Sequence, residues 1–378
     1  MKRYDYALAG GGLQNGLIAL ALALRQPEAS IALIEANDHL GGNHTWSFHA
    51  SDVPAEARKI VQPLVVATWP GYQVRFPGHH RTLASPYATI TSERFDTVLR
   101  AAARAHGWDL RLGAHVEATD LNRVTLATGE ELSARCVIDS RGPLFQATNC
   151  GYQKFVGLEI QTKKSWPDCL PTVMDAEQPQ SDGFHFIYTL PLLPNRVLVE
   201  DTFFSDTPIL DVEACRKRVV DYIEQRTGWC QILREESGVL PMPWSAEPCT
   251  APEGSPLRGG YCGGWFHPAT GYSFPAALRL ALAISAVPSE SAHKATAALA
   301  RRLQPRWAFA RFLNWLLFRL VPPDGRWQVF DRLHRTLPPA VLARFYALEF
   351  SVADAARVVF GRPPRIDLFR LLQGSGRI

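Results

Sequence analysis

Residues 4–16 of the chain read YDYALAGGGLQNG, and this stretch decides the fold. Its apolar beginning predicts a buried strand, the glycines at 10–12 predict a tight turn, and the Leu- and Ala-rich segment 13–25 predicts a helix. A second apolar run, SIALI at 30–34, ends at Glu35. These elements form a βαβ unit of about 30 residues, whose strands are expected to pair in parallel with a right-handed crossover. The chain therefore begins as an α/β protein.

The glycine turn has most of a dinucleotide-binding fingerprint. Gly10 and Gly12 occupy its first two glycine positions, whereas Asn15 stands at the third and Gly16 follows. In such a turn, backbone N–H groups and a helix N-terminus face a pyrophosphate, and an acid such as Glu35 accepts hydrogen bonds from a ribose. The alternative is a glycine turn of any α/β protein, but the placement of Glu35 favours a dinucleotide. The predicted cofactor contacts here are Gly10, Gly12, Leu13 and Glu35.

A second glycine-rich segment, GYCGGWFHPATGYS at 260–273, lies between a predicted strand and a predicted helix. It resembles the C-terminal FAD motif of flavoprotein hydroxylases and geranylgeranyl reductases, which directs a helix N-terminus at the flavin edge where negative charge gathers on reduction. Tyr261 stands where those families usually carry an Asp for the ribitol, so the resemblance does not extend to that contact. The segment VIDSRG at 137–142 resembles a strand and turn near the cofactor in the same families. This resemblance adds four predicted flavin contacts: Arg94, Gly264, Gly271 and Tyr272.

The middle of the chain differs from both ends. Strand-like runs separated by Pro and Gly turns predict an antiparallel sheet inserted into the nucleotide-binding domain, and the last part reads as helices broken at prolines, the first at Pro305. The fold class is α/β: an FAD-binding Rossmann-like domain, an inserted antiparallel β-sheet substrate domain and a helical C-terminal region, as in flavoprotein hydroxylases and geranylgeranyl reductases. The predicted boundaries are 1–64, 85–147 and 255–300 for the FAD-binding domain, 65–84 and 148–254 for the substrate domain, and 301–378 for the helical region.

Three further segments make the resemblance more specific: NHTWSFH at 43–49, the hairpin from FHFIYTLP at 184–191 to LVEDT at 198–202, and GWFHP at 264–268. Together they resemble bacterial lycopene β-cyclases over almost the whole chain. The resemblance implies a redox-neutral enzyme that closes the ψ-ends of lycopene, by way of γ-carotene, into β-ionone rings. It also implies bound FAD that works in its reduced form, with NAD(P)H as reductant, although a dinucleotide fold alone indicates only an oxidoreductase.

Glu200 interrupts an apolar, β-branched strand. Strand alternation places Leu198, Glu200 and Thr202 on one face and Asp201 on the other, so the two neighbouring acids cannot share a site. If the Glu200 face lines an apolar carotenoid pocket, desolvation raises the pKa of Glu200 and keeps it protonated, as a proton donor to an alkene requires. An ordinary edge-strand residue is the alternative, and the family resemblance favours catalysis. Whether Glu200 donates the first proton or removes the later one stays open.

Cyclisation must protonate a terminal double bond, let the neighbouring alkene attack the cation and then remove a ring proton. A reduced, anionic flavin beside the substrate would stabilise that cation electrostatically, which explains a flavin in a reaction without net electron transfer. His267, within the flavin motif, is a second catalytic candidate as a proton relay, with a structural role as the alternative. Trp46, Phe186 and Tyr188 are the expected substrate contacts, with plain core packing as the alternative.

Composition restricts the partners. The 378 residues carry a net charge of +4, with Lys and Arg spread along the chain, so no nucleic-acid footprint is expected. The seven cysteines occur singly and without a zinc pattern, which predicts reduced thiols and no metal. The first strand begins at about Tyr4, which leaves no room for a targeting segment, and no apolar stretch reaches the roughly 20 residues of a membrane span.

Phe309, Phe312, Trp315 and Leu316 form an apolar helix surface flanked by arginines, including Arg311, which suits an interfacial helix. A core helix that closes the substrate domain is the alternative. Because lycopene resides in lipid, we expect a peripheral protein on the cytoplasmic side of the membrane.

Two other function classes fit parts of the pattern. A flavin redox enzyme, either a monooxygenase or a carotenoid or prenyl reductase, fits the cofactor motifs equally well. A carotenoid-binding flavoprotein without catalysis is the third possibility. The mass of the product separates them, since cyclisation leaves it unchanged, hydroxylation adds oxygen, reduction adds hydrogen and binding alone leaves lycopene as it was.

Overall fold

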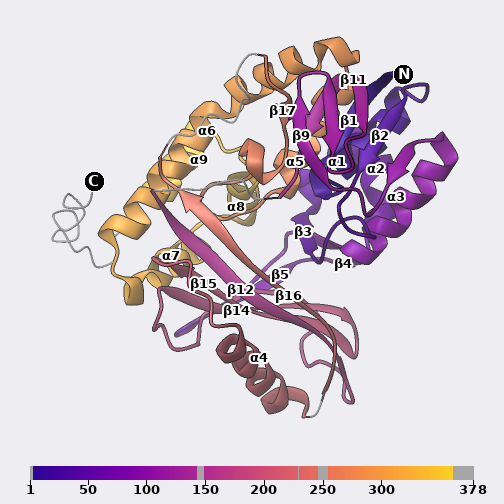
Figure 1. Ribbon diagram of the computed structural model, residues 1–378. Coiled ribbons are helices and arrows are strands. Elements are labelled where there is room, and N and C mark those ends of the chain that lie inside the picture. Colours follow the sequence, from indigo (N-terminus) through magenta and orange to yellow (C-terminus); the bar gives the residue numbers. More distant parts are fainter. Residues whose placement is uncertain (1–2, 143–148, 229, 246–253, 361–378) are drawn as a thin grey trace.

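The computed structural model describes residues 3–142, 149–228, 230–245 and 254–360. Figure 1 shows two parts side by side: a sheet flanked by α1, α2 and α3, and a longer-stranded sheet with α4 on its far face. Helices of the C-terminal region run along one side of both parts. The fold class predicted from the sequence is confirmed.

The first sheet has seven strands in the order β8-β2-β1-β11-β10-β9, with β17 paired to β11. Its centre is parallel, and β9 and β10 add an antiparallel edge. β1 lies inside the sheet, where Tyr6, Ala7 and Leu8 are fully buried, as expected of a parallel strand covered on both faces. The strands are β1 (Arg3–Ala9), β2 (Ile31–Ile34), β8 (Asp109–Arg111), β9 (Val116–Asp120), β10 (Arg123–Leu126), β11 (Glu131–Asp139) and β17 (Leu257–Arg258).

The predicted helix α1 (Leu13–Arg25) follows the glycine turn. The side-chain amide of Asn15 donates to the carbonyls of Ala9 and Gly10, both at 2.9 Å, and ties the start of the helix to the end of β1. Gly16 permits the close helix packing instead, because a Cβ there would lie 2.2 Å from the Phe95 ring. The close helix packing that the third glycine of the fingerprint would allow therefore occurs one residue later, at Gly16. Phe95 belongs to α3 (Ser92–His106).

The second sheet has seven strands in the order β16-β12-β15-β14-β13-β5-β6 and is antiparallel except for the parallel pair β13 and β5. The sequence pattern missed α4 (Val212–Thr227), which buries Val219, Tyr222 and Ile223 against the outer face of this sheet. The inner face is thereby left to line the space between the two parts. The strands are β5 (Tyr72–Phe76), β6 (His79–Leu83), β12 (Cys150–Thr162), β13 (Thr172–Asp175), β14 (Phe184–Leu193), β15 (Arg196–Ser205) and β16 (Cys230–Pro243).

A small antiparallel sheet in the order β3-β7-β4 brings the first loop of the nucleotide-binding domain to the second sheet. β4 differs from the prediction, because the sequence placed it in the inserted sheet, whereas it pairs with β7. The elements are β3 (Thr45–His49), the short helix α2 (Arg58–Val61), β4 (Ala67–Trp69) and β7 (Tyr87–Thr91).

The C-terminal region is helical as far as it is described. The break predicted at Pro305 is wrong: α6 continues through it, since Leu303 and Trp307 on either side are buried and hold the helix in place. The side chain of Asn314 donates to the carbonyls of Pro243 at 3.0 Å and Pro268 at 2.7 Å, so α6 joins the second sheet to the flavin-motif loop. The helices are α5 (Phe274–Ser285), α6 (Ala292–Leu320), α7 (Trp327–Thr336), α8 (Pro339–Tyr346) and α9 (Val352–Val359). The later part of the predicted helical region, 361–378, lies outside the described residues.

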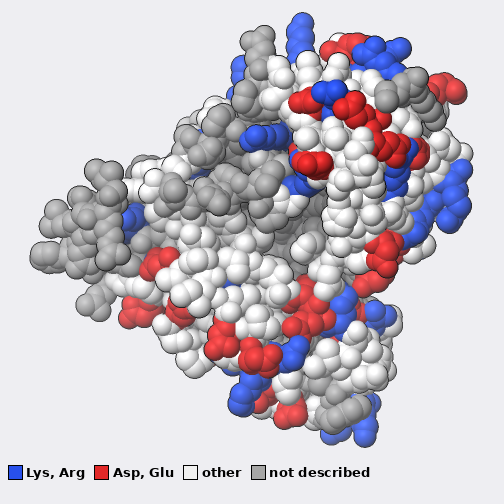
Figure 2. Space-filling model, viewed as in Figure 1, with Lys and Arg blue, Asp and Glu red and all other residues white. Residues whose placement is uncertain are grey.

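On the face shown in Figure 2, acidic and basic side chains are interspersed at both ends of the molecule, with a largely uncharged surface between them. Within the described ranges, no helix is both long and apolar enough to cross a membrane.

Candidate active site

A cavity of about 900 Å³ lies between the glycine turn of the first sheet and the inner face of the second. Gly12 and Glu35 line one end of it, which we call the nucleotide end. Tyr188 and Glu200 line the other, which we call the carboxyl end. Most of the residues predicted for the cofactor, and all three predicted for the substrate, therefore line one continuous space. Its size is typical of ligand sites.

The nucleotide end has the geometry that a dinucleotide needs. Gly10 adopts a φ of +93°, and a Cβ there would lie 2.9 Å from the Ser140 carbonyl oxygen. Gly12 is the N-cap of α1, and apart from its chain neighbours no atom of the described residues lies within 4 Å of where its Cβ would be, so the backbone is open to a ligand. The Glu35 carboxylate accepts a hydrogen bond from the Gly11 N–H at 2.7 Å and is held against the turn. These residues fit a pyrophosphate at the helix N-terminus and a ribose at Glu35.

The second glycine motif closes the cavity from the other side. Gly271, Tyr272 and Tyr261 line it, and α5 begins there. Gly271 must be a glycine, since its φ is +67° and a Cβ would lie 2.7 Å from the Gln153 side-chain oxygen. The hydroxyl of Tyr261, in place of an Asp, donates to the Gly271 carbonyl and braces the loop. The N-terminus of α5 therefore opens onto the same space as the N-terminus of α1.

Glu200 projects from β15 into the carboxyl end of the cavity. Its Oε1 accepts a hydrogen bond from the Thr202 hydroxyl at 2.8 Å. Burial raises the pKa of Glu200 to about 8, and the nearby Glu236 carboxylate adds to the rise. Glu200 therefore holds a proton near neutral pH.

Asp201 lies on the opposite face of β15, as strand alternation predicted. It is fully buried, and its carboxylate binds His185 Nε2 at 2.5 Å and Arg218 Nε at 2.9 Å. Arg218 belongs to α4, so Asp201 fastens that helix to the sheet. The two adjacent acids thus have separate surroundings.

Aromatic side chains form much of the wall around Glu200. The three predicted substrate contacts, Trp46, Phe186 and Tyr188, all line the cavity, and the Tyr188 hydroxyl donates to Ser47 Oγ at 2.9 Å. Sequence reasoning missed several other lining residues. They include Tyr72, Tyr87, Met174, Phe204 and Tyr346. They come from β5, β7, β13, β15 and α8, and no local motif marks any of them.

Three predicted site residues lie outside the cavity lining. Arg94 is exposed on α3 and donates from Nε to the Pro63 carbonyl at 2.7 Å, so it does not face the flavin site. Gly264 takes a φ of +72° at the end of a short 3₁₀ turn. His267 is fully buried, packs edge-on against Phe345, and has its pKa lowered to about 3 by burial. The structural alternative accounts for this enclosed position, and the proton relay stays a prediction.

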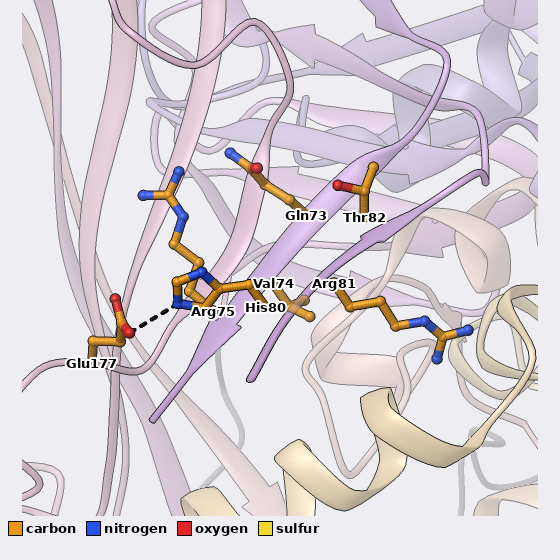
Figure 3. Close-up of a pocket in the computed structure, with 7 residues that line it drawn as sticks. All are labelled: Gln73, Val74, Arg75, His80, Arg81, Thr82 and Glu177. Atoms are coloured by element: carbon orange, nitrogen blue, oxygen red, sulfur yellow. Dashed lines mark hydrogen bonds and ion pairs between the residues drawn. The ribbon is translucent and has the colours of Figure 1, made fainter. Parts of the chain in front are cut away.

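A separate hollow of about 410 Å³ lies on the outer strands β5 and β6 (Figure 3). Figure 3 shows His80 and Glu177 joined across it. Its arginines are already engaged, Arg75 with Asp168 at 2.7 Å and Arg81 with the Leu337 carbonyl at 2.9 Å. This hollow therefore adds no group to the site.

Solved structures share this architecture. The chain superimposes with a TM-score of 0.67 on a geranylgeranyl bacteriochlorophyll reductase-like protein from Thermoplasma acidophilum, with 15% identity over 95% of this chain and 96% of that one. A flavin-dependent brominase gives a TM-score of 0.63 at 13% identity, over 94% of this chain and 97% of that one. At such identities the likeness concerns the fold. The fold is thus of the class seen in a geranylgeranyl reductase-like protein, a flavin-dependent brominase and a probable FAD-dependent monooxygenase.

Within that class, the chain belongs to the lycopene cyclase family. The family described as lycopene cyclase protein matches residues 5–371. The lycopene beta-cyclase of Pantoea ananas is 41% identical over 96% of this chain and 95% of its own length. That of Paracoccus sp. is 38% identical over 96% of this chain and 94% of its own.

Proposed function

We propose that the chain is a lycopene β-cyclase, which converts the ψ-ends of lycopene and then of γ-carotene into β-ionone rings without net oxidation or reduction. Family membership supports the substrate class. The observation that carries the proposal is Glu200: a carboxyl group that burial keeps protonated, inside an aromatic cavity shared with a dinucleotide-type turn. In overall class the reaction is an isomerisation.

FAD is the cofactor that the residues at the nucleotide end fit. Gly10, Gly12 and Leu13 would receive the pyrophosphate, Glu35 a ribose, and the loop at Gly271 and Tyr272 the flavin side of the molecule. When bound and reduced, with NAD(P)H as the source of electrons, the flavin would supply negative charge beside the substrate and so stabilise a carbocation.

The chain's own residues then account for acid catalysis. Glu200 donates its carboxyl proton to the terminal alkene, and the neighbouring alkene forms the ring bond. Phe186, Tyr188 and Trp46 exclude water from the cation and present aromatic faces to it. Loss of a ring proton restores the charge balance, so the substrate is rearranged and keeps its mass.

Contact with a membrane surface supplies the substrate in this proposal. On α6, Phe312 is 47% exposed and stacks on Trp315 at 6.2 Å between ring centroids, while Leu316 is half-buried beside them. This apolar edge suits an interfacial helix of a peripheral protein on the cytoplasmic side of the membrane. Arg311 is not part of its flank, since it is buried at 7% exposure.

The proposal is tested by expressing the chain in cells that accumulate lycopene and analysing their carotenoids. We expect γ-carotene and β-carotene, both of unchanged mass. Products that have gained oxygen or hydrogen would indicate a monooxygenase or a reductase instead, and unaltered lycopene bound to the protein would indicate a binding protein.

A further inference from the structure

Glu200 faces a second acid across a single glycine. In the strand register, Gly157 of β12 is the partner both of Glu200 on β15 and of Glu236 on β16, so the three residues form one row across the sheet. A Cβ at position 157 would lie 3.1 Å from Cγ of Glu236 and 3.4 Å from Cγ of Glu200. Both acidic side chains therefore lean over the glycine toward each other, and any other residue there would separate them.

The two acids differ in their partners. Glu236 is 4% exposed, and its Oε2 accepts hydrogen bonds from Arg234 at 2.7 Å and from the Thr45 hydroxyl at 3.2 Å. Glu200 has the Thr202 hydroxyl, and within the described part of the chain no Lys or Arg forms an ion pair with it. Burial raises the pKa of Glu236 too, but Arg234 and the Thr45 hydroxyl both act against that rise. A cation in direct contact favours the ionised form of a carboxyl group, so of the two acids Glu236 is the one that carries the negative charge.

In the neighbouring row of the sheet, a third acid, Glu159, binds the same arginine as Glu236. Arg234 is the register partner of Glu159, and its Nε lies 3.1 Å from that carboxylate. Arg196 also binds Glu159. Three buried-face acids, Glu159, Glu200 and Glu236, therefore share two guanidinium groups. Since an unpaired buried charge is costly, one acid must keep its proton, and Glu200 is the one without a guanidinium contact.

We propose that Glu236 is a positioning residue for the cyclisation: held as a carboxylate by Arg234, it makes Glu200 the member of the pair that carries the proton, across the gap that Gly157 leaves open. This inference rests on the proposed function and deepens it. When Glu200 gives its proton to the alkene, a C–H bond forms and the pair becomes doubly negative beside the cation, which stabilises it. The ring proton released at the end can return to Glu200, so the pair finishes as it began.

The other titratable groups around Glu200 do not change which acid of the pair carries the proton. Tyr188 on β14 and Tyr87 on β7 face it, and burial raises the pKa of both phenols, so they stay neutral. Asp201 lies on the reverse face, paired with His185 and Arg218. The charges that act on Glu200 are thus those of Glu236 and, more weakly, Asp201, which raise its pKa, and that of Arg234, which lowers it.

Because Glu236 and Arg234 shift the pKa of Glu200 in opposite directions, replacing each of them in turn tests the inference. The activity of flavin-loaded, reduced enzyme on lycopene in lipid vesicles is measured as kcat/KM against pH. For the native chain we expect activity to fall as pH rises through the Glu200 pKa of about 8, because a donor must be protonated. Glu236→Gln should move this limb to lower pH by about one unit or more, and Arg234→Gln should move it to higher pH. Arg234→Lys should restore the native profile.

Glu235→Gln is the control, since Glu235 lies one residue along the same strand and pairs with Arg216 on the α4 side. Its profile should superimpose on that of the native chain. A uniform fall in the activity of Glu236→Gln across the pH range, with the limb unmoved, would mean a structural role and would overturn the inference. If that variant fails to fold, an unmoved limb in Arg234→Gln overturns it equally.

An infrared titration of the protonated carboxyl band gives a readout without turnover. The band should be lost at lower pH in Glu236→Gln than in the native protein, and it should be absent in Glu200→Gln. An identical midpoint in Glu236→Gln and the native chain would refute the pairing. A native chain that makes no cyclic product but shows the predicted infrared shifts would sink the proposed function and leave the pair intact.

Discussion

The two ends of the cavity are built in different ways. At the nucleotide end, Gly10, Gly12 and Glu35 lie within one βαβ unit, and the geometry follows from a local pattern of glycines and one acid. At the carboxyl end, Glu200 and Glu236 come from two strands that are not neighbours but flank β12. The nucleotide end is thus formed by one local sequence motif, whereas the carboxyl end is formed by the pairing of distant strands.

That difference separates binding from chemistry. One fold can serve enzymes of many kinds: a reductase-like protein, a brominase and a probable monooxygenase all share this one. The reaction depends on which side chains the second sheet turns inward. A variant at one end should therefore leave the other end working.

The strongest test of this independence is Glu200→Gln. Cyclisation should fall by about 100-fold or more, because the amide cannot donate a carboxyl proton, while flavin binding stays as in the native chain. Product analysis and the flavin absorbance of the purified protein measure the two effects. Asp201→Asn is the control: it weakens the link to α4 and should lower the melting temperature while cyclisation by the folded protein persists. Loss of flavin from Glu200→Gln would contradict the separation of the two ends.

The converse variant is Gly12→Val. Its side chain would occupy the space open to the pyrophosphate, and we expect flavin affinity to fall by about 10- to 100-fold. Because the described part of the chain places no atom other than those of the chain neighbours within 4 Å of the added Cβ, the melting temperature of the flavin-free protein should not change. Gly12→Ala should give a smaller loss of affinity. Full flavin occupancy in the valine variant would mean that the pyrophosphate lies elsewhere.

A change outside both ends tests how the substrate arrives. Phe312→Asp places a charge on the exposed apolar edge of α6 and should weaken partition onto lipid vesicles by about tenfold, with flavin binding unchanged. Cosedimentation with vesicles measures the partition. Ile209→Asp, at a site that is 75% exposed before α4, is the matched control and should bind vesicles as the native chain does. If the two variants lost vesicle binding to the same extent, α6 would not be the part of the protein that contacts the membrane.

Sequence alone identified most of the residues that line the nucleotide end, and only part of those at the carboxyl end. The glycine turn, Glu35 and the flavin loop are short-range patterns whose geometry is nearly independent of the rest of the chain. Strand alternation also separated Glu200 from Asp201 correctly, because a period of two needs no tertiary information.

What the sequence could not show depends on which strands become neighbours. Glu236 was missed because nothing in its own segment indicates that β12 lies between it and Glu200. Gly157 looked like any strand glycine. Tyr346, from a helix near the described end of the chain, reaches the cavity only through packing of the C-terminal region. The helix break predicted at Pro305 was wrong for the same reason, since packing of the buried residues around it outweighs the local tendency of proline to end a helix.

Arg94→Gln gives the smallest expected effect and defines the boundary of the nucleotide end. The family resemblance placed Arg94 beside the flavin, whereas its side chain is exposed and bonded to the Pro63 carbonyl. Because this side chain is exposed and lies outside the cavity lining, flavin occupancy and cyclisation should stay within about twofold of the native values. Flavin titration and the rate of ring formation measure both quantities. A fall of tenfold or more in flavin affinity would show that Arg94 turns inward when the cofactor binds, and would extend the nucleotide end beyond the local motif into α3.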